Sequence, residues 1–228
     1  MTGYQIAYRL PQIERPRRGS VARLRSMLLY GTAVFVAAMV LGNLTIISAH
    51  LWARETTTLS TAHAPADVHN FVVVDDKVMR GSRPTEAAYR DLARAGVTTV
   101  VDLRAEDLPR PMALLDRLGI EIVSIPMRDG QAPTQHQVDR FMAAVQNSAG
   151  KVYVHCMAGV GRTGTMVAAY LVEERGLDPL SALRMNMAVG PPSLEQIAFA
   201  AETDSPNPLV VGVSRVLDAP RRIWTYVN

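Results

Sequence analysis

Residues 151–164 read KVYVHCMAGVGRTG, and this stretch decides how the rest of the chain folds. Its first five residues, 151–155, are mostly apolar or β-branched, which is typical of a buried strand. Glycines at 159, 161 and 164 permit a tight loop, and the apolar run 163–174 predicts a helix directly after it. The stretch therefore predicts a strand, a loop and a helix whose N-terminus faces the end of the strand.

On either side of this stretch, strand and helix patterns alternate. Thr134 and Gln137 form a capping-box pair at the start of one predicted helix, and Gly96 and Gly119 end two others. Such alternation predicts an α/β fold with a mostly parallel central sheet flanked by helices. The further strand patterns lie at residues 71–74, 97–103 and 120–125, and the helical patterns at 84–95, 108–118, 134–150, 179–187 and 193–202.

The loop after the strand has the composition of an anion site. Backbone N–H groups of a glycine-rich turn converge on one point, and a helix N-terminus adds positive potential there. Such surroundings favour a thiolate at Cys156, and Arg162 can bind two phosphoryl oxygens at once. We therefore expect attack of sulfur on a phosphoryl group through a covalent thiophosphate. The loop amides belong to Met157, Ala158, Gly159, Val160 and Gly161.

Residues 155–164, HCMAGVGRTG, resemble the HCxxGxxRTG signature of the cysteine-based protein-tyrosine and dual-specificity phosphatase superfamily. The resemblance spans residues 71–202 and is tight only at 155–164. It implies that Cys156 is the nucleophile and Arg162 the phosphate-binding arginine. It also implies that Thr163 assists departure of the thiolate and that His155 steadies the loop. The alternative for Cys156 is a buried structural cysteine.

Asp129 is the candidate general acid and base. It lies in IPMRDGQAP, residues 125–133, after a predicted strand and 27 residues before Cys156. The context resembles the Asp-Gly-x-x-Pro loop of small dual-specificity phosphatases, and the alternative is a turn-forming aspartate before glycine. Asp102 with Arg104 is interpreted as structural, and Glu106 and Asp107 are competing acids without an assigned role.

Two further motifs are weaker. Residues 80–84, RGSRP, resemble the Arg-Ser-x-x-Pro turn of small relatives, with Gly81 in place of serine, and are expected to shape the pocket wall. Gln196 lies where relatives often carry a glutamine near the active site. The variable positions of the signature loop carry no cation, which disfavours a polyphosphorylated substrate. The small size of the domain and the lack of an obvious phosphotyrosine-gripping loop before residue 97 favour a shallow cleft that accepts several phosphomonoesters.

Charge and cysteine content exclude several classes of protein. Residues 1–25 carry a net charge of +5 and the remaining residues a net charge of −2, so no basic surface for nucleic acid is expected. A single cysteine excludes a disulfide scaffold and a zinc site built from several thiolates. We expect neither a cofactor nor a metal.

The N-terminal part has the pattern of a membrane anchor. Residues 26–49 contain no charged side chain and are long enough to cross a bilayer, so we predict a transmembrane helix at 27–49 that contacts lipid. The basic residues 1–26 predict a cytoplasmic N-terminus and an extracytoplasmic catalytic domain. The alternatives are a cleaved signal peptide and the inverted topology. The ratio of 22 arginines to 2 lysines hints at a GC-rich bacterial genome, and hence a bacterial plasma membrane.

The predicted organisation is thus an anchor, a tether at 50–69 rich in Thr, Ala and Pro, a phosphatase domain at 70–204, and a C-terminal extension at 205–228. The predicted function is a membrane-anchored phosphomonoester hydrolase with a phosphocysteine intermediate, acting on phosphorylated tyrosine, serine or threonine in proteins. One alternative is a lipid or isoprenoid phosphate phosphatase with the same mechanism. Another is a pseudophosphatase that binds phosphate without turnover.

Overall fold

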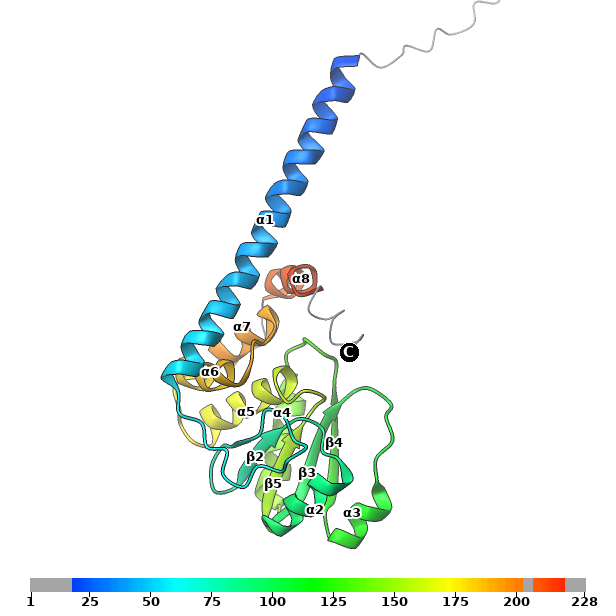
Figure 1. Ribbon diagram of the computed structural model, residues 1–228, viewed down its shortest axis with the longest axis vertical. Helices are drawn as coiled ribbons and strands as arrows, with labels where there is room; N and C mark the ends of the chain where they lie inside the picture. The colour runs from blue at the N-terminus through cyan, green and yellow to red at the C-terminus, as the bar shows by residue number, and fades with distance from the viewer. Residues whose placement is uncertain (1–17, 203–206, 220–228) are drawn as a thin grey trace, which may run out of the picture. The chain divides into compact units, whose positions relative to one another are not determined.

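The computed structural model describes residues 18–202 and 207–219, and residues 72–155 of it contain a five-stranded sheet flanked by helices (Figure 1). The predicted strand at 151–155 is β5 (Lys151–His155), the middle strand of the order β1-β2-β5-β3-β4. The last four strands in that order pair in parallel, and β1 pairs antiparallel with β2. The other strands are β1 (Val72–Val73), β2 (Val78–Gly81), β3 (Val97–Arg104) and β4 (Glu121–Met127).

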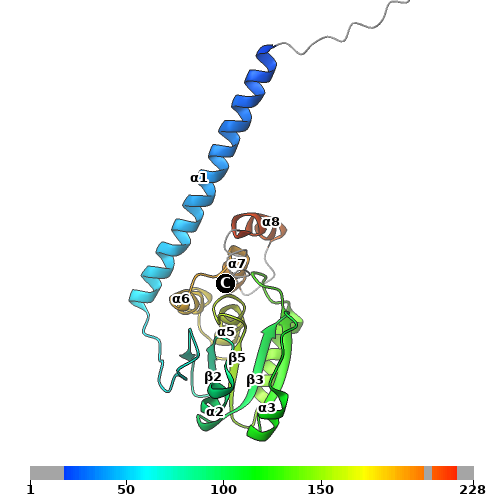
Figure 2. The ribbon, with the colours of Figure 1, turned by 45° about the vertical axis from the view of Figure 1, so that its right-hand side comes forward.

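Helices cover both faces of the sheet, which confirms the predicted α/β class. Val152 and Val154 of β5 join one apolar cluster with α4 and α5, whereas Tyr153 joins a second cluster with α2 and α3. Helices α5, α6 and α7 contact one another and lie together in both ribbon views (Figures 1 and 2). The helices of this part are α2 (Glu86–Arg94), α3 (Met112–Leu118), α4 (Gln135–Asn147), α5 (Gly161–Glu173), α6 (Pro179–Val189), α7 (Leu194–Glu202) and α8 (Pro208–Leu217).

Strand β2 is missing from the sequence prediction, which interpreted residues 80–84 as a turn. Arg80 is instead a residue of β2, aligned with Val154 of β5. The strand is only 4 residues long and lies between two turn-forming segments, so its own pattern is weak. Its pairing with β5, more than seventy residues away along the chain, decides its conformation.

Helix starts follow the local capping chemistry. The capping box of Thr134 and Gln137 is present at α4, as predicted. Helix α3 begins at Met112 rather than near residue 108, because prolines at 109 and 111 disfavour helix before them.

The long helix α1 (Arg18–Thr56) contains the uncharged run. The described residues divide into two units, with the boundary between Gly42 and Asn43. Helix α1 contains an 18-residue window with a mean hydropathy of 1.9, and its segment Val21–Thr56 is long and apolar enough to cross a membrane. Residues 1–17 of the basic terminus, and residues 203–206 and 220–228 at and within the C-terminal extension, lie outside the described residues.

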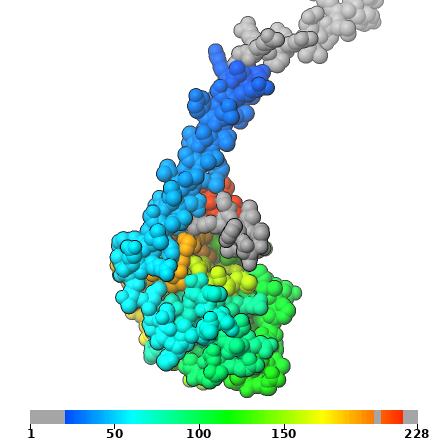
Figure 3. Space-filling view, viewed as in Figure 1, coloured from blue at the N-terminus to red at the C-terminus, as the bar shows by residue number. Residues whose placement is uncertain are grey.

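The segment predicted as a tether, 50–69, differs from that expectation. Helix α1 continues to Thr56, and Ala53 is buried in the larger apolar cluster. Farther on, Ser60 forms an isolated bridge with Val73, and Val68 is buried in the second cluster. The space-filling view shows this segment lying against the rest of its unit (Figure 3). The small side chains of alanines allow this segment to pack closely against the apolar clusters, and an open strand edge offers it backbone hydrogen-bond partners. The amino-acid composition alone reveals neither effect.

Candidate active site

The loop between β5 and α5 lies at the carboxyl end of the central strand. In parallel sheets, this edge is where ligands bind. Cys156 follows β5 directly, and its side chain is almost completely buried. The backbone N–H of Gly159 donates to Cys156 Sγ at 3.3 Å, so the loop curves around the sulfur. Helix α5 begins at Gly161, and its N-terminus therefore lies at the same point.

Gly159 is at the tightest point of the loop. Its φ of +75° lies in the left-handed region that favours glycine. A Cβ atom there would lie 2.3 Å from the carbonyl carbon of Gly81 and 2.6 Å from the backbone nitrogen of Ser82. The loop and the end of β2 therefore approach each other backbone to backbone, and only glycine fits.

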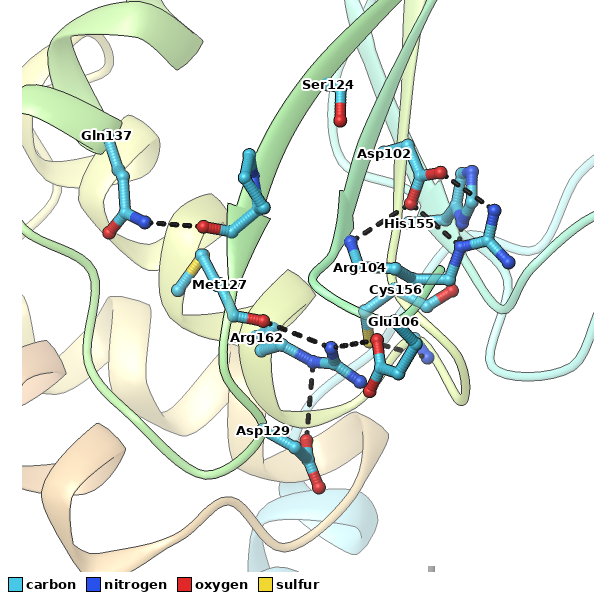
Figure 4. A network of polar contacts seen from close by, with 12 residues as sticks. Asp102, Arg104, Glu106, Ser124, Met127, Asp129, Gln137, His155, Cys156 and Arg162 are labelled. Atoms are coloured by element: carbon cyan, nitrogen blue, oxygen red, sulfur yellow. Dashed lines mark hydrogen bonds and ion pairs between the residues drawn. The ribbon is translucent and has the colours of Figure 1, made fainter. Parts of the chain in front are cut away.

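Two carboxylates converge on Arg162, which is in the first turn of α5 (Figure 4). Arg162 Nη1 lies 2.8 Å from Glu106 Oε2, and Nε lies 3.3 Å from Asp129 Oδ1. Nη1 also donates to the carbonyl oxygen of Met127 at 3.2 Å. The carboxylates follow β3 and β4, so the same edge of the sheet supplies both. The structure thus brings Asp129, Arg162 and Cys156 close to one another.

The charges at this cluster reinforce one another. Burial opposes the charge on Arg162, but the hydrogen bond to Glu106 and the attraction of Cys156 and Asp129 raise its pKa above the ordinary value. Burial likewise opposes ionisation of Glu106, and the bond from Arg162 outweighs it, so the pKa of Glu106 is lowered. Arg162 therefore keeps its positive charge next to the loop that follows Cys156.

His155 is fully buried behind the loop. Burial lowers its pKa to about 4, although the nearby Asp102 carboxylate opposes that shift. At neutral pH the ring is therefore uncharged, and its Nδ1, 2.9 Å from the carbonyl oxygen of Cys156, donates a hydrogen bond. Asp102 is held by Arg104, with Oδ2 2.8 Å from Nη2, and by Arg110 at 2.7 Å. Both contacts fit the structural interpretation of Asp102 and Arg104.

Thr163 and Gln196 complete the buried polar groups around the loop. The Thr163 hydroxyl has no hydrogen-bond partner within the described residues. Gln196 Nε2 donates to the carbonyl oxygen of Gln131 at 3.2 Å, and a Cβ at Gly161 would lie 2.7 Å from Gln196 Oε1. Gln196 therefore links the Asp129 loop to the nucleophile loop, a stronger placement than its sequence pattern suggested.

Sequence reasoning left Glu106 without a role, although the structure places its carboxylate on Arg162. The available signal was positional, because Glu106 follows β3 at the same edge of the sheet as Asp129. Arg80 was expected in the pocket wall and instead lies buried under the loop. The sequence pattern did not indicate this position, because strand β2, which contains Arg80, was not predicted.

A buried thiol that accepts from a loop amide and lies near a buried arginine fits a cysteine-based phosphatase, and the comparisons place the chain in the protein-tyrosine and dual-specificity class. The family model described as "DSP-PTPase phosphatase fused to NAD+ Kinase" matches residues 59–202, and the chain belongs to that family.

Individual relatives agree with this assignment. The chain is 37% identical over 98 residues to NAD kinase 2, chloroplastic, of Arabidopsis thaliana, which covers 40% of this chain and 10% of that protein. It is 36% identical over 81 residues to tyrosine-protein phosphatase cdc-14 of Caenorhabditis elegans, covering 36% of this chain and 11% of that protein. The chain spans between about a tenth and a half of the length of the curated relatives it matches.

Solved structures show the same fold. The crystal structure of Tk-PTP in the active form superposes with a TM-score of 0.52 at 26% identity, covering 59% of this chain and 97% of that one. The core catalytic domain of the Saccharomyces cerevisiae phosphatase SIW14 superposes with a TM-score of 0.53 at 18% identity, covering 67% of this chain and 93% of that one.

Proposed function

We propose that the chain is a membrane-anchored phosphatase that hydrolyses phosphomonoesters of proteins through a phosphocysteine at Cys156. The observation that carries the proposal is the convergence of Cys156, Arg162 and Asp129 at the carboxyl end of the sheet. Arg162 and the amides of residues 157–161 supply positive charge for the three non-bridging phosphoryl oxygens. The 36% identity over 81 residues to tyrosine-protein phosphatase cdc-14 of Caenorhabditis elegans supports the substrate class.

The first step transfers the phosphoryl group to sulfur. The Cys156 thiolate attacks phosphorus as the bond to the ester oxygen breaks, and the Asp129 carboxyl group donates its proton to that oxygen. Asp129 is partly exposed and adjoins the phosphate-binding Arg162, a position suited to reaching a leaving group.

The second step releases phosphate. The Asp129 carboxylate takes a proton from water, the water oxygen attacks phosphorus, and the sulfur–phosphorus bond breaks to restore the thiolate. Thr163, whose buried hydroxyl is not engaged within the described residues, donates a hydrogen bond to the departing sulfur. His155, neutral and bonded to the carbonyl of Cys156, steadies the loop throughout.

Substitutions at the two reactive groups test this mechanism. Cys156→Ser abolishes hydrolysis of p-nitrophenyl phosphate, and the proposal is wrong if the rate is unchanged. Asp129→Asn slows esters with poor leaving groups, such as phenyl phosphate, by about 100-fold or more, and p-nitrophenyl phosphate far less. Equal losses on both esters would remove Asp129 as the acid.

Membrane attachment through residues 27–49 rests on separate observations. The side chains of Met27, Leu29 and Val34 are each at least 70% exposed, as expected of a helix that contacts lipid rather than protein. We propose a cytoplasmic N-terminus and an extracytoplasmic phosphatase domain, because the flanking positive charge lies before the helix. Reporters of each compartment fused after Asn228 test the topology, and carbonate-resistant membrane association tests the anchor.

The apolar helix also favours one other substrate class, a lipid or isoprenoid phosphate. Turnover of a tyrosine phosphopeptide and of a phosphorylated lipid in vesicles by the same preparation separates the two. Faster turnover of the lipid would replace the protein substrate in this proposal. Binding of phosphate without turnover of either would indicate a pseudophosphatase.

A further inference from the structure

Arg80 is buried against residues 156–161 between β5 and α5, which we call the nucleophile loop. Its guanidinium Nη2 donates to the carbonyl oxygen of Gly159 at 2.6 Å and to that of Val160 at 3.2 Å. Nη1 lies 3.3 Å from Asn186 Oδ1 on α6. The side chain is 2% exposed, so these contacts are shielded from water. Strand β2 holds Arg80 in place because it pairs with β5, from which the loop emerges.

Bonds to carbonyl oxygens also orient the N–H groups of the loop. In a trans peptide the C=O and the following N–H point in opposite directions. When Arg80 binds the carbonyls of Gly159 and Val160, the N–H groups of Val160 and Gly161 face the opposite side, where an anion would bind. The contacts of Arg80 with the two carbonyl oxygens therefore set the direction of the N–H groups on the opposite side of the loop.

The preceding peptides of the loop are bonded in the same way. Asn70 Nδ2 donates to the carbonyl of Ala158 at 2.9 Å, and the N–H in the same peptide plane is the one that reaches Cys156 Sγ. The backbone N–H of Arg83 donates to the carbonyl of Met157 at 2.9 Å. Asn70 itself has a φ of +54°, an uncommon conformation for a residue other than glycine. Four successive carbonyls are thus bonded by residues of the segment 70–83.

We propose that Arg80 is a positioning residue of the phosphatase reaction, fixing the peptide planes after Gly159 and Val160 so that their N–H groups face the bound phosphoryl group. This inference rests on the proposed function. It assigns to β2 a role that resemblance to a turn motif did not indicate.

The charge of Arg80 adds to this effect. Its contacts within the described residues are to neutral oxygens, whereas Arg104 and Arg162 contact carboxylates. Burial lowers the pKa of Arg80 to about 10, so it stays charged at neutral pH, and attraction to Cys156 favours that charge. This attraction acts in both directions, so the buried guanidinium of Arg80 also favours negative charge near the sulfur. Tyr153 on β5 and Arg162 on α5 also interact with the thiol, His155 precedes it on β5, and Arg162 in turn contacts Glu106 after β3 and Asp129 after β4.

Two substitutions separate the geometry from the charge. The full chain in detergent is compared with Arg80→Lys, which keeps the charge but cannot bridge two carbonyls in the same planar way, and Arg80→Met, which loses both. Arg90→Met is the matched control, since it removes an exposed arginine of α2 that pairs with Glu86. The readouts are the affinity for vanadate and the pH at which half of Cys156 reacts with iodoacetamide, both measured at a temperature where each variant is folded.

We expect Arg80→Lys to weaken vanadate binding about 10-fold while the labelling midpoint moves little. Arg80→Met weakens it about 100-fold and moves the midpoint upward by about one pH unit, and Arg90→Met changes neither. Vanadate affinities of both Arg80 variants within twofold of the parent would overturn the inference. A lower melting temperature alone, with both readouts unchanged, would make Arg80 purely structural and also overturn it.

The test also remains decisive if Arg80→Met does not fold. Arg80→Lys is then compared with Asn70→Ala, which removes one tie to the loop without a change of charge. Weaker vanadate binding by both supports positioning through the carbonyls, whereas no change in Arg80→Lys overturns it. The proposed function fails separately, when vanadate does not protect Cys156 from alkylation in the parent chain.

Discussion

Replacing Gly159 by alanine tests how closely the nucleophile loop must approach β2. The added Cβ would lie 2.3 Å from the carbonyl carbon of Gly81, 2.4 Å from its oxygen and 2.6 Å from the nitrogen of Ser82. All three are backbone atoms of ordered structure and cannot rotate away. The φ of +75° costs a further ~1–2 kcal/mol for a residue with a Cβ. The loop must therefore move, and the Gly159 N–H leaves the sulfur.

The expected effect falls on activity much more than on stability. Losing one donor at an oxyanion site typically lowers the rate by about 100-fold or more, and here the neighbouring amides shift as well. We expect kcat/KM for p-nitrophenyl phosphate to fall at least ~100-fold. The melting temperature drops by only ~2–8 °C, because a loop can move while the sheet stays packed.

A second glycine gives a matched control. Gly119 ends α3 with a φ of +66°, and a Cβ there would meet no atom within 4 Å in the described residues. Gly119→Ala therefore carries similar backbone strain without a collision, and its kcat/KM stays within about twofold of the parent. Activity of Gly159→Ala within threefold of the parent would refute the argument. An equal loss in Gly119→Ala would show that strain, and not the close approach, is responsible.

Three further predictions concern groups around the loop. Glu106→Gln removes the carboxylate from Arg162, and we expect kcat/KM to fall about 10-fold because the guanidinium loses its orientation; a rise would mean that Glu106 competes with substrate. The pKa of about 4 at His155 lies below the unfolded value of 6.5, so the unfolded chain takes up a proton first and stability falls as the pH drops from about 6.5 to 4. By urea unfolding, the parent loses about 2 kcal/mol more than His155→Gln between pH 7 and pH 5, and equal losses would contradict this. Deleting residues 207–228 removes Ser214 and Asp218, whose side chains accept hydrogen bonds from the first backbone amides of α7. We therefore expect the melting temperature to fall by several degrees, and an unchanged melting temperature would show that these caps are dispensable.

The sequence was most informative where chemistry and local conformation depend on neighbouring residues. The strand, loop and helix around Cys156 could be predicted because β-branched residues, glycines and the helix start lie within 14 consecutive positions. The capping box at Thr134 was predictable for the same reason. These features act over a few residues, within the range that a local pattern covers.

Strand β2 and Glu106 show where such reasoning stops. The four residues of β2 have no strong pattern, and their strand conformation depends on hydrogen bonds to β5. Glu106 is one of two adjacent acids, and its role depends on which side chain meets Arg162 across the sheet edge. In both cases the partner is more than fifty residues away.

The sequence by itself determined the loop after Cys156 and the alternation of strands and helices, and it pointed to Cys156 as the proposed nucleophile. The tertiary structure decided which groups surround that loop: Arg80 behind it, Glu106 and Asp129 on Arg162, and the segment 57–69 against the domain. The physical reason is the separation along the chain over which each kind of interaction acts. Backbone preferences and caps act between neighbours in the chain, whereas the electrostatics of a buried site arise between side chains that only the packed sheet brings together.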